Sequence, residues 1–240
     1  MGESVMKILI TGAKGFVGKN LVASLKNIRD GKDRVHPIKG LEHPEDLTIY
    51  EYDIDSTLEE LDAYCKDADF VFNLAGVNRP KNQEDFMKGN FGFASTLLDT
   101  LKKYGNKAPV MLSSSIQASL TGRFAGSEYG KSKLAGEELF QKYSEETGAK
   151  VLIYRFPNLF GKWCRPNYNS AVATFSNNIA NGLPITVNDR STELELLYID
   201  DLIEEMILAL NGEEHRDEQG FCICPVTFHV TLGEIVDLLY

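Results

Sequence analysis

Short apolar runs alternate with amphipathic segments of helical length through the first two thirds of the chain. This alternation is typical of βαβ units, whose strands form a parallel sheet with helices on both faces. We therefore expect an α/β fold with a doubly wound parallel sheet. The expected strands are 7–11, 34–38, 48–52, 70–74, 110–113 and 150–155, and the expected helices lie near 16–28, 57–66, 84–104 and 129–147.

The alternation loosens after residue 156. There we expect a helix near 170–181, a helix near 200–211 and a strand near 221–225. This pattern predicts a sheet domain over 1–156 and a small substrate-binding lobe over 157–240. A capping box, Thr231 to Glu234, opens a last helix whose apolar residues continue to the final position, so we expect this helix to be truncated.

Charge and apolar run length exclude several classes of partner. The chain has 25 Lys and Arg against 35 Asp and Glu, a net charge of −10, which repels nucleic acid and anionic lipid. No apolar run approaches the roughly 20 residues that span a bilayer. The four cysteines and four histidines show no metal-ligand spacing. We therefore expect no nucleic-acid partner, no membrane association, no metal site and a cytoplasmic location.

A glycine triplet follows the first expected strand and leads directly into the first expected helix. Gly12 permits a tight turn, Gly15 lets the backbone approach a phosphate, and Gly18 allows close packing of helix and strand. In this context the triplet predicts a Rossmann-like dinucleotide site, with a simple βα turn as the alternative. The residues expected to contact the cofactor here are Gly12, Lys14, Gly15, Phe16, Val17 and Gly18.

The choice between NAD and NADP depends on which residues end the second strand, where an acid binds the ribose hydroxyls and a base tolerates the 2′-phosphate. If 34–38 is that strand, Lys39 follows it and favours NADP(H), and Asp53 is then an acceptor near the adenine. If 48–52 is that strand, Asp53 ends it and favours NAD. We expect NADP(H), with NAD possible, although Lys39 could equally be a solvated loop charge.

Tyr129 and Lys133 open the longest expected amphipathic helix. Residues four apart share one helix face, so the phenol and the ammonium can act at one site. A nearby positive charge stabilises the phenolate, which suits Tyr129 to donate a proton to a carbonyl oxygen. Ser115, at the end of an expected strand, would polarise that oxygen. A tyrosine packing on a lysine stem is the structural alternative.

These motifs together resemble the extended short-chain dehydrogenase/reductase family that works on nucleotide sugars. The resemblance implies that Lys133 also holds the nicotinamide ribose and that Asn158 lies near the substrate phosphates. The further cofactor contacts implied are Leu74, Ala75, Gly76, Ser113, Tyr129, Lys133 and Phe156. The substrate contacts implied are Asn78, Arg79, Ser115, Asn158, Arg165, Asn169 and Arg190.

Within that family, segments 74–80, 112–117 and 157–170 resemble the CapF-type subfamily of capsular-polysaccharide reductases. The likeness implies NADPH-dependent reduction of a UDP-linked 4-keto-6-deoxy-N-acetylhexosamine, and a homodimer formed through helices 84–104 and 129–147. A zinc cupin domain follows the reductase domain in that subfamily. Family members often clamp pyrophosphate with an arginine where this chain has Leu194, so Arg165 or Arg190 would have to replace it.

Three other functions are compatible with a dinucleotide-binding fold to different degrees. A sugar 4,6-dehydratase needs an Asp-Glu pair after the catalytic hydroxyl, whereas this chain has Ile116 and Gln117. A nucleotide-sugar 4-epimerase uses the same tyrosine and lysine and is the main alternative. A regulator that senses the dinucleotide without chemistry would not need Tyr129, Lys133 and Ser115 in register.

Overall fold

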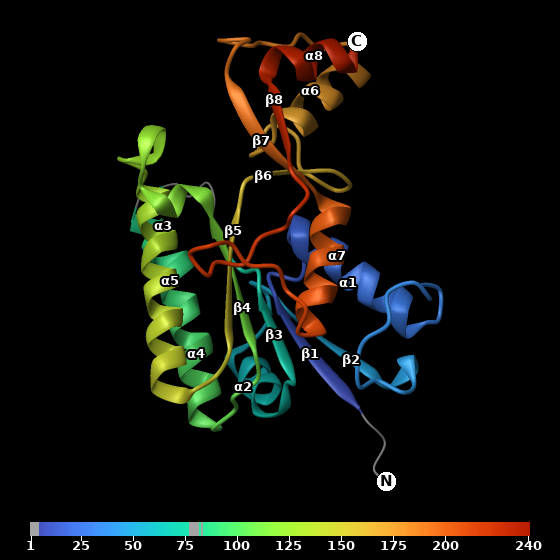
Figure 1. Cartoon of the computed structure of the whole chain (residues 1–240), viewed down its shortest axis with the longest axis vertical. Helices are drawn as coiled ribbons and strands as arrows, with labels where there is room; N and C mark the ends of the chain where they lie inside the picture. Colours follow the sequence, from blue (N-terminus) through green and yellow to red (C-terminus); the bar gives the residue numbers. More distant parts are fainter. Residues whose placement is uncertain (1–4, 77–81, 83) are drawn as a thin grey trace.

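A computed structural model describes residues 5–76, 82 and 84–240. It contains a five-stranded parallel sheet with the order β2-β1-β3-β4-β5 and a three-stranded sheet with the order β6-β7-β8 (Figure 1). The strands of the first sheet are β1 (Met6–Thr11), β2 (Leu47–Tyr52), β3 (Phe70–Asn73), β4 (Val110–Ser115) and β5 (Val151–Phe156). Those of the second are β6 (Asn158–Phe160), β7 (Glu193–Tyr198) and β8 (Phe228–Thr231).

The helices cover both faces of the large sheet, as expected for a doubly wound fold (Figure 1). The α-helices are α1 (Phe16–Arg29), α2 (Leu58–Asp67), α3 (Glu84–Phe86), α4 (Phe93–Lys103), α5 (Glu128–Thr147), α6 (Ala171–Ala180), α7 (Ile199–Leu210) and α8 (Leu232–Leu239). Short 3₁₀ turns are η1 (Pro44–Asp46), η3 (Ile116–Ser119) and η4 (Gly122–Phe124). None of the helices in the described part of the chain is long and apolar enough to cross a bilayer.

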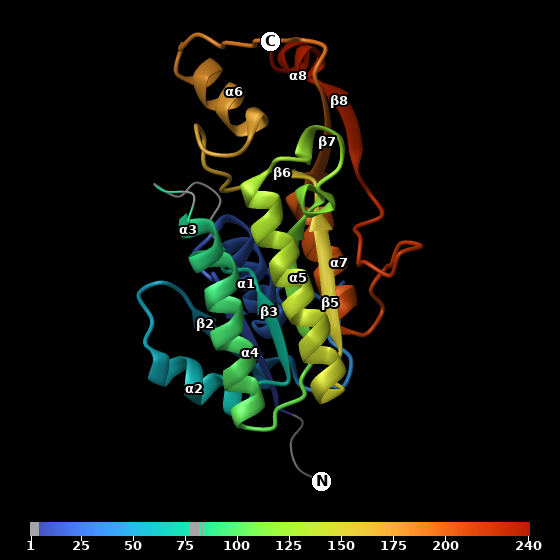
Figure 2. The same cartoon turned by 90° about the vertical axis from the view of Figure 1, so that its left-hand side faces the viewer.

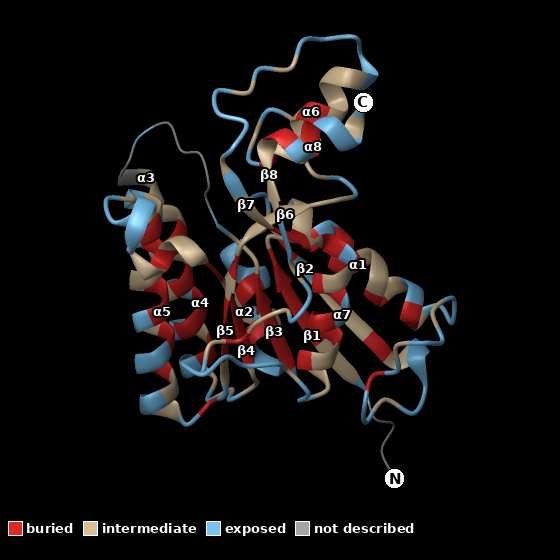
Figure 3. Ribbon diagram, turned by 45° about the horizontal axis from the view of Figure 1, so that its top comes forward, coloured by how far each residue is buried: buried red, intermediate tan, exposed pale blue. Residues whose placement is uncertain are grey.

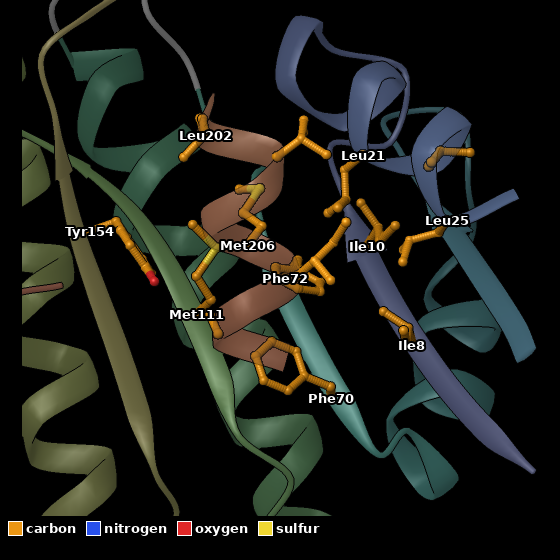
Figure 4. Packing of buried hydrophobic residues seen from close by; sticks show 14 of the residues in the cluster. Ile8, Ile10, Leu21, Leu25, Phe70, Phe72, Met111, Tyr154, Leu202 and Met206 are labelled. Carbon is orange, nitrogen blue, oxygen red and sulfur yellow. The ribbon is translucent and has the colours of Figure 1, made fainter. Parts of the chain in front are cut away.

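The buried strands explain the continuous apolar runs in the sequence. Ile8 and Ile10 of β1 belong to the core beneath α1 and α7, whereas Leu9 belongs to the core beneath α2, α4 and α5. Successive side chains of a strand point to opposite faces, so a sheet covered on both sides needs apolar residues at every position. Figure 4 shows the first core, where Leu21 of α1 and Met206 of α7 pack over the sheet.

The expected strand at 34–38 is wrong: this segment is a loop, and β2 pairs directly with β1. Asp33 accepts hydrogen bonds from the backbone N–H of Val35 (2.9 Å) and of His36 (3.3 Å), and its carboxylate also contacts the His36 ring. Pro37 has no N–H to give to a sheet. A local turn therefore uses the donors that a strand would need.

Two other expectations need correction. The expected helix at 84–104 is interrupted by a π-helical turn, η2 (Met87–Gly92), between α3 and α4. The expected strand at 221–225 is a loop in which Cys222 makes an isolated bridge with Tyr154 of β5. The strands of the C-terminal region are β6, β7 and β8 instead, which the loosened pattern did not predict.

The segment after residue 156 contributes to two cores. Helix α7 packs on α1 and joins the core of the large sheet, together with Cys222. The small sheet, α6 and α8 form a separate cluster around Phe175, Leu196 and Ile235. This cluster sits beyond the carboxyl ends of the large sheet's strands, as Figures 2 and 3 show.

Candidate active site

A cavity of about 810 Å³ lies where the glycine loop, the end of β4, the start of α5 and the segment after β5 meet. This is the carboxyl edge of the parallel sheet, where α/β proteins bind ligands, beside the switch point between β1 and β3. Its lining contains most of the residues expected to bind cofactor or substrate. They are Gly12, Lys14, Gly15, Phe16, Val17, Gly18, Leu74, Gly76, Ser113, Ser115, Tyr129, Lys133, Phe156, Asn158, Arg165 and Asn169.

Two glycines of the glycine loop, Gly12 and Gly18, lie too close to neighbouring backbone to carry a side chain. A methyl group on Gly12, whose φ is 69°, would lie 2.7 Å from the backbone nitrogen of Ala75, and one on Gly18 would lie 2.1 Å from the carbonyl oxygen of Gly12. Helix α1 begins at Phe16, and its N-cap Gly15 provides no side-chain cap. The first backbone N–H groups of this 14-residue helix are therefore left for another acceptor, such as a pyrophosphate.

Gly76 lines the same cavity and lies close to Lys133. A methyl group there would lie 2.9 Å from the Asn90 side-chain oxygen and 3.2 Å from the Lys133 ammonium. The glycine thus keeps a space open between the glycine loop and α5. Together these features fit a dinucleotide laid from the glycine loop toward Lys133.

The residues expected to distinguish NAD from NADP lie apart from one another. Lys39 forms an ion pair with Glu213, its backbone N–H donates to Asn211, and it does not line the cavity. Asp53 directly follows β2, and its carboxylate accepts a 2.7 Å hydrogen bond from the backbone N–H of Lys14. The prediction of NADP(H) from Lys39 was therefore based on the wrong second strand.

The fold brings Ser115, Tyr129 and Lys133 together from β4 and α5. Both Ser115 and Lys133 are 7% exposed, and the Lys133 ammonium lies 5.4 Å from the centre of the Tyr129 ring. That ammonium donates a 3.0 Å hydrogen bond to the carbonyl oxygen of Ser113. Ser127 caps α5 by accepting from the backbone N–H of Gly130 (2.8 Å), which fixes where the helix begins.

Burial dominates the ionisation of this group. It raises the pKa of Tyr129 to about 12, an effect opposed by a side-chain hydrogen bond with Ser115. It lowers the pKa of Lys133 to about 8, an effect opposed by the nearby carboxylate of Glu137. At neutral pH the phenol is therefore protonated and the amine charged, as a general acid with a cationic neighbour requires.

Ser114, the neighbour of Ser115 in β4, has a different partner: its hydroxyl donates a 2.5 Å hydrogen bond to Glu137. Ser115 is the serine that contacts the phenol. The alternation of side chains along β4 separates the two residues, because neighbours in a strand face opposite ways.

Several expected residues do not line the cavity. Arg190 contacts Asp237 (2.6 Å) and the carbonyl oxygen of Gly233 (3.2 Å), both in α8. Ala75 lies between lining residues Leu74 and Gly76 but is not itself in the lining, and Asp53 is also absent from it. Asn78 and Arg79 lie outside the described residues. Leu194, which stands where the family resemblance implies an arginine, packs with the apolar cluster of the small sheet.

Sequence reasoning missed other lining residues. The segment between Ser115 and Tyr129 contributes Arg123 and Phe124 of η4, and the loop after β6 contributes Trp163 and Tyr168. Arg123 stands 4.9 Å from the Phe124 ring, and Arg165 stands 5.5 Å from the Tyr168 ring. The Arg-Phe pair was visible in the sequence, but no motif or periodicity placed it at the site.

The profile of the NAD dependent epimerase/dehydratase family matches residues 8–223. The chain is 38% identical over 235 residues to a UDP-2-acetamido-2,6-beta-L-arabino-hexul-4-ose reductase of Pseudomonas aeruginosa, covering 98% of this chain and 57% of that protein. It is 28% identical over 246 residues to UDP-glucuronate 4-epimerase 4 of Arabidopsis thaliana, covering 89% of this chain and 56% of that protein.

The crystal structure of the capsular polysaccharide assembling protein CapF from Staphylococcus aureus superposes with a TM-score of 0.80 at 46% identity, covering 98% of this chain and 58% of that one. The chain thus spans little more than half the length of these relatives. The match to the family profile covers the glycine loop, Ser115, Tyr129, Lys133 and α7. The chain belongs to the NAD dependent epimerase/dehydratase family.

Proposed function

We propose that this chain is the reductase portion of an enzyme that reduces a UDP-linked 4-keto-6-deoxy-N-acetylhexosamine with a reduced nicotinamide dinucleotide. Such a step would supply a precursor for capsular or other surface polysaccharide. The proposal rests on one observation: the Tyr129 phenol and the buried Lys133 amine line a cavity whose described charged residues are all basic.

The charge of the cavity differs from that of the chain. The protein has a net charge of −10, yet none of the described residues that line this cavity is acidic. Lys14 and Lys19 lie at the glycine-loop end, and Arg123 and Arg165 come from the opposite segments, η4 and the loop after β6. Positive charge from the glycine loop and from the segments η4 and after β6 suits two anionic ligands in one cavity, a dinucleotide and a nucleotide sugar.

The residues of the chain can divide the chemistry between them. A reduced nicotinamide, when bound, would supply the hydride. Ser115 would donate a hydrogen bond to the keto oxygen of the sugar, and Tyr129 would give that oxygen its proton. The ammonium of Lys133 would then stabilise the phenolate that remains on Tyr129.

The substrate class follows from the relatives. The Pseudomonas relative is named a UDP-2-acetamido-2,6-beta-L-arabino-hexul-4-ose reductase, and the Staphylococcus structure is of a capsular polysaccharide assembling protein. Both match this chain over 98% of its length, including the cavity. We therefore assign the same class of substrate to this chain.

A nucleotide-sugar 4-epimerase is the second candidate, because the UDP-glucuronate 4-epimerases match the chain over 89% of its length or more. A 4,6-dehydratase fits less well. The side chain of Gln117, which stands where a dehydratase needs an acid, accepts a 2.8 Å hydrogen bond from Ser127 and cannot donate a proton as an acid does.

One incubation series separates these functions. The purified chain is mixed with NADH or NADPH and a panel of UDP-4-keto sugars and UDP-hexoses, and both absorbance and products are followed. A reductase oxidises the cofactor and forms the 4-hydroxy sugar. An epimerase interconverts UDP-hexoses with no net change in absorbance, and a regulator gives neither result. Absence of cofactor oxidation with every keto sugar would contradict the proposal.

We infer that NAD(H) fits the adenosine end better than NADP(H). Asp53 directly follows β2, the strand beside β1, and an acid at this position accepts from ribose hydroxyls and repels a 2′-phosphate. The Lys14 ammonium, which could attract that phosphate, is paired with Asp55.

The cofactor inference is tested by comparing kcat/KM for NADH and NADPH in the parent and in Asp53→Asn. The asparagine keeps an oxygen that can accept from the Lys14 N–H, so the loop should hold its shape. We expect the parent to prefer NADH and the variant to lose about tenfold of that preference. Glu45→Gln, an exposed acid in η1, is the matched control and should change neither value. A parent that prefers NADPH would overturn the inference.

A further inference from the structure

A buried ion pair lies directly behind the catalytic residues and has no part in the proton transfer described above. Glu137 of α5 is 1% exposed and accepts two hydrogen bonds from Arg155 of β5, at 2.9 and 2.7 Å. The Ser114 hydroxyl donates a third, at 2.5 Å. The Arg155 guanidinium also lies 3.8 Å from the centre of the Phe221 ring. These contacts fix the positions of the Glu137 carboxylate and the Arg155 guanidinium.

The Glu137–Arg155 ion pair and its Ser114 partner connect α5 and β4, the two elements that carry the proposed catalytic residues. Glu137 lies one helical turn after Lys133, so the two side chains share a face of α5. Ser114 lies between Ser113, which accepts from Lys133, and Ser115. Arg155 pairs with Ser114 in the register of β4 and β5.

Few ionisable groups of the described residues interact with Lys133. On α5 it faces Tyr129 and Glu137, and on β4 it faces the carbonyl oxygen of Ser113. The π-helical turn contributes the neutral side chain of Asn90, which approaches the Gly76 position as Lys133 does. Among the described residues, Arg155 carries the charge that is paired with Glu137. The acids beyond it, Glu195 and Asp217, line a separate hollow on the far side of the arginine.

The signs of these charges matter because the Lys133 and Glu137 side chains are buried. The Glu137 carboxylate favours the charged form of Lys133, whereas a guanidinium favours the neutral form of a nearby amine. If the carboxylate alone were removed, an unpaired buried guanidinium would be left beside a buried ammonium, and two like charges in low dielectric repel strongly.

We infer that Glu137 is a positioning residue that neutralises the buried Arg155, so that Lys133 stays charged beside Tyr129 at neutral pH. The pair acts through Lys133 and touches neither substrate nor cofactor. The inference deepens the proposed function and rests on it for kinetics, but the ionisation of Lys133 can be measured without any substrate.

The test is an NMR titration of Lys133, with lysines labelled at ¹³Cε and the signal assigned by its loss in Lys133→Met. In Glu137→Gln we expect the Lys133 midpoint to fall by about one pH unit. In Glu137→Gln/Arg155→Met both buried charges are gone, and the midpoint should return toward that of the parent. In active protein, the basic limb of kcat/KM for the keto sugar should move in the same directions.

Two controls separate charge from structure. Glu205→Gln removes another glutamate with 2% exposure, whose partners Tyr154 and His215 lie on the opposite side of the sheet, and should leave the Lys133 midpoint unchanged. Arg155→Lys keeps the charge while losing the paired geometry, so stability should fall with little change in the midpoint.

An unchanged Lys133 midpoint in Glu137→Gln would overturn the inference, and so would a double variant with a lower midpoint than the single one. If Glu137→Gln does not fold, the Lys133 midpoint in Arg155→Met tests the inference instead. It removes only positive charge, so a fall in the Lys133 midpoint there would contradict the inference. A parent that titrates as expected but reduces no keto sugar would refute the proposed function and leave this inference standing.

Discussion

The ammonium of Lys133 donates a 3.0 Å hydrogen bond to the backbone carbonyl oxygen of Ser113. This bond ties the second turn of α5 to the carboxyl end of β4, two residues before Ser115. The amine therefore cannot move away from the serine without breaking a bond to the sheet. The spacing of the phenol, amine and hydroxyl is thus set by the packing of α5 on β4.

The Tyr129 phenol is the proton donor in the proposed reaction. Tyr129→Phe keeps the ring that packs edge-on against Phe86 but removes the proton. We expect turnover to fall by about a hundredfold or more, because general acid catalysis is lost, while cofactor binding stays nearly intact. Turnover of the keto sugar and titration of cofactor fluorescence measure the two effects.

The matched control for this change is Tyr143→Phe, one hydroxyl removed from the same helix at a residue 2% exposed. Its phenol donates a 3.3 Å hydrogen bond to the Asn106 carbonyl oxygen, away from the cavity. It should lose a little stability and keep its turnover. Near-normal turnover in Tyr129→Phe would remove the phenol from the mechanism.

Lys133→Met should make the protein inactive and more stable at pH 7. Burial lowers the pKa of Lys133 from 10.5 to about 8, so the folded state holds its proton less tightly than the unfolded state does. The cost of burying the charge is then on the order of 3 kcal/mol at most, reduced by the lost bond to Ser113.

The stability that Lys133→Met gains over the parent should decrease as the pH rises. Below pH 8 both states carry the proton and the parent bears the full cost. Between about pH 8 and 10.5 the unfolded state binds more protons than the folded state, so the stability of the parent rises and the advantage of Lys133→Met shrinks. Urea unfolding of both proteins at pH 7 and pH 9.5 measures this. A constant difference between them would show that Lys133 keeps an ordinary pKa.

The glycine loop makes a separate prediction. Gly18→Ala would put a methyl group 2.1 Å from the Gly12 carbonyl oxygen, so either the loop or α1 has to move. We expect cofactor affinity to fall at least tenfold, together with a loss of stability of about 2 kcal/mol. In Gly136→Ala, within α5, the nearest atom would be 3.8 Å away, and this control should be neutral or stabilising. Equal cofactor affinity in both variants would contradict the assignment of the loop.

The sequence predicted the features that depend on local chemistry. The glycines after β1, the buried strands and the capped helix α5 each follow from residue types at fixed spacing, and all lie where expected. The second strand was misplaced because the apolar residues Val35 and Ile38 are typical of a strand. In the structure the backbone N–H groups of Val35 and His36 donate to Asp33 instead, which forms a turn. Arg123 was missed for a different reason: only the folded chain shows that η4 borders the cavity.

The arginines of the cavity and of the lobe give the last prediction, since Leu194 stands where the family resemblance implies an arginine that binds the substrate diphosphate. Arg165 and Arg123 line the cavity, whereas Arg190 is held by α8. We expect Arg165→Gln and Arg123→Gln each to weaken binding of UDP, measured by calorimetry, by about tenfold, because a charge-assisted contact with phosphate is lost. Arg190→Gln should lower the stability of the lobe through its lost bond to Asp237 and leave UDP binding unchanged. The opposite ranking, with Arg190 dominant, would show that the diphosphate lies against α8 and outside the cavity, since no rearrangement of the two cavity arginines could produce it.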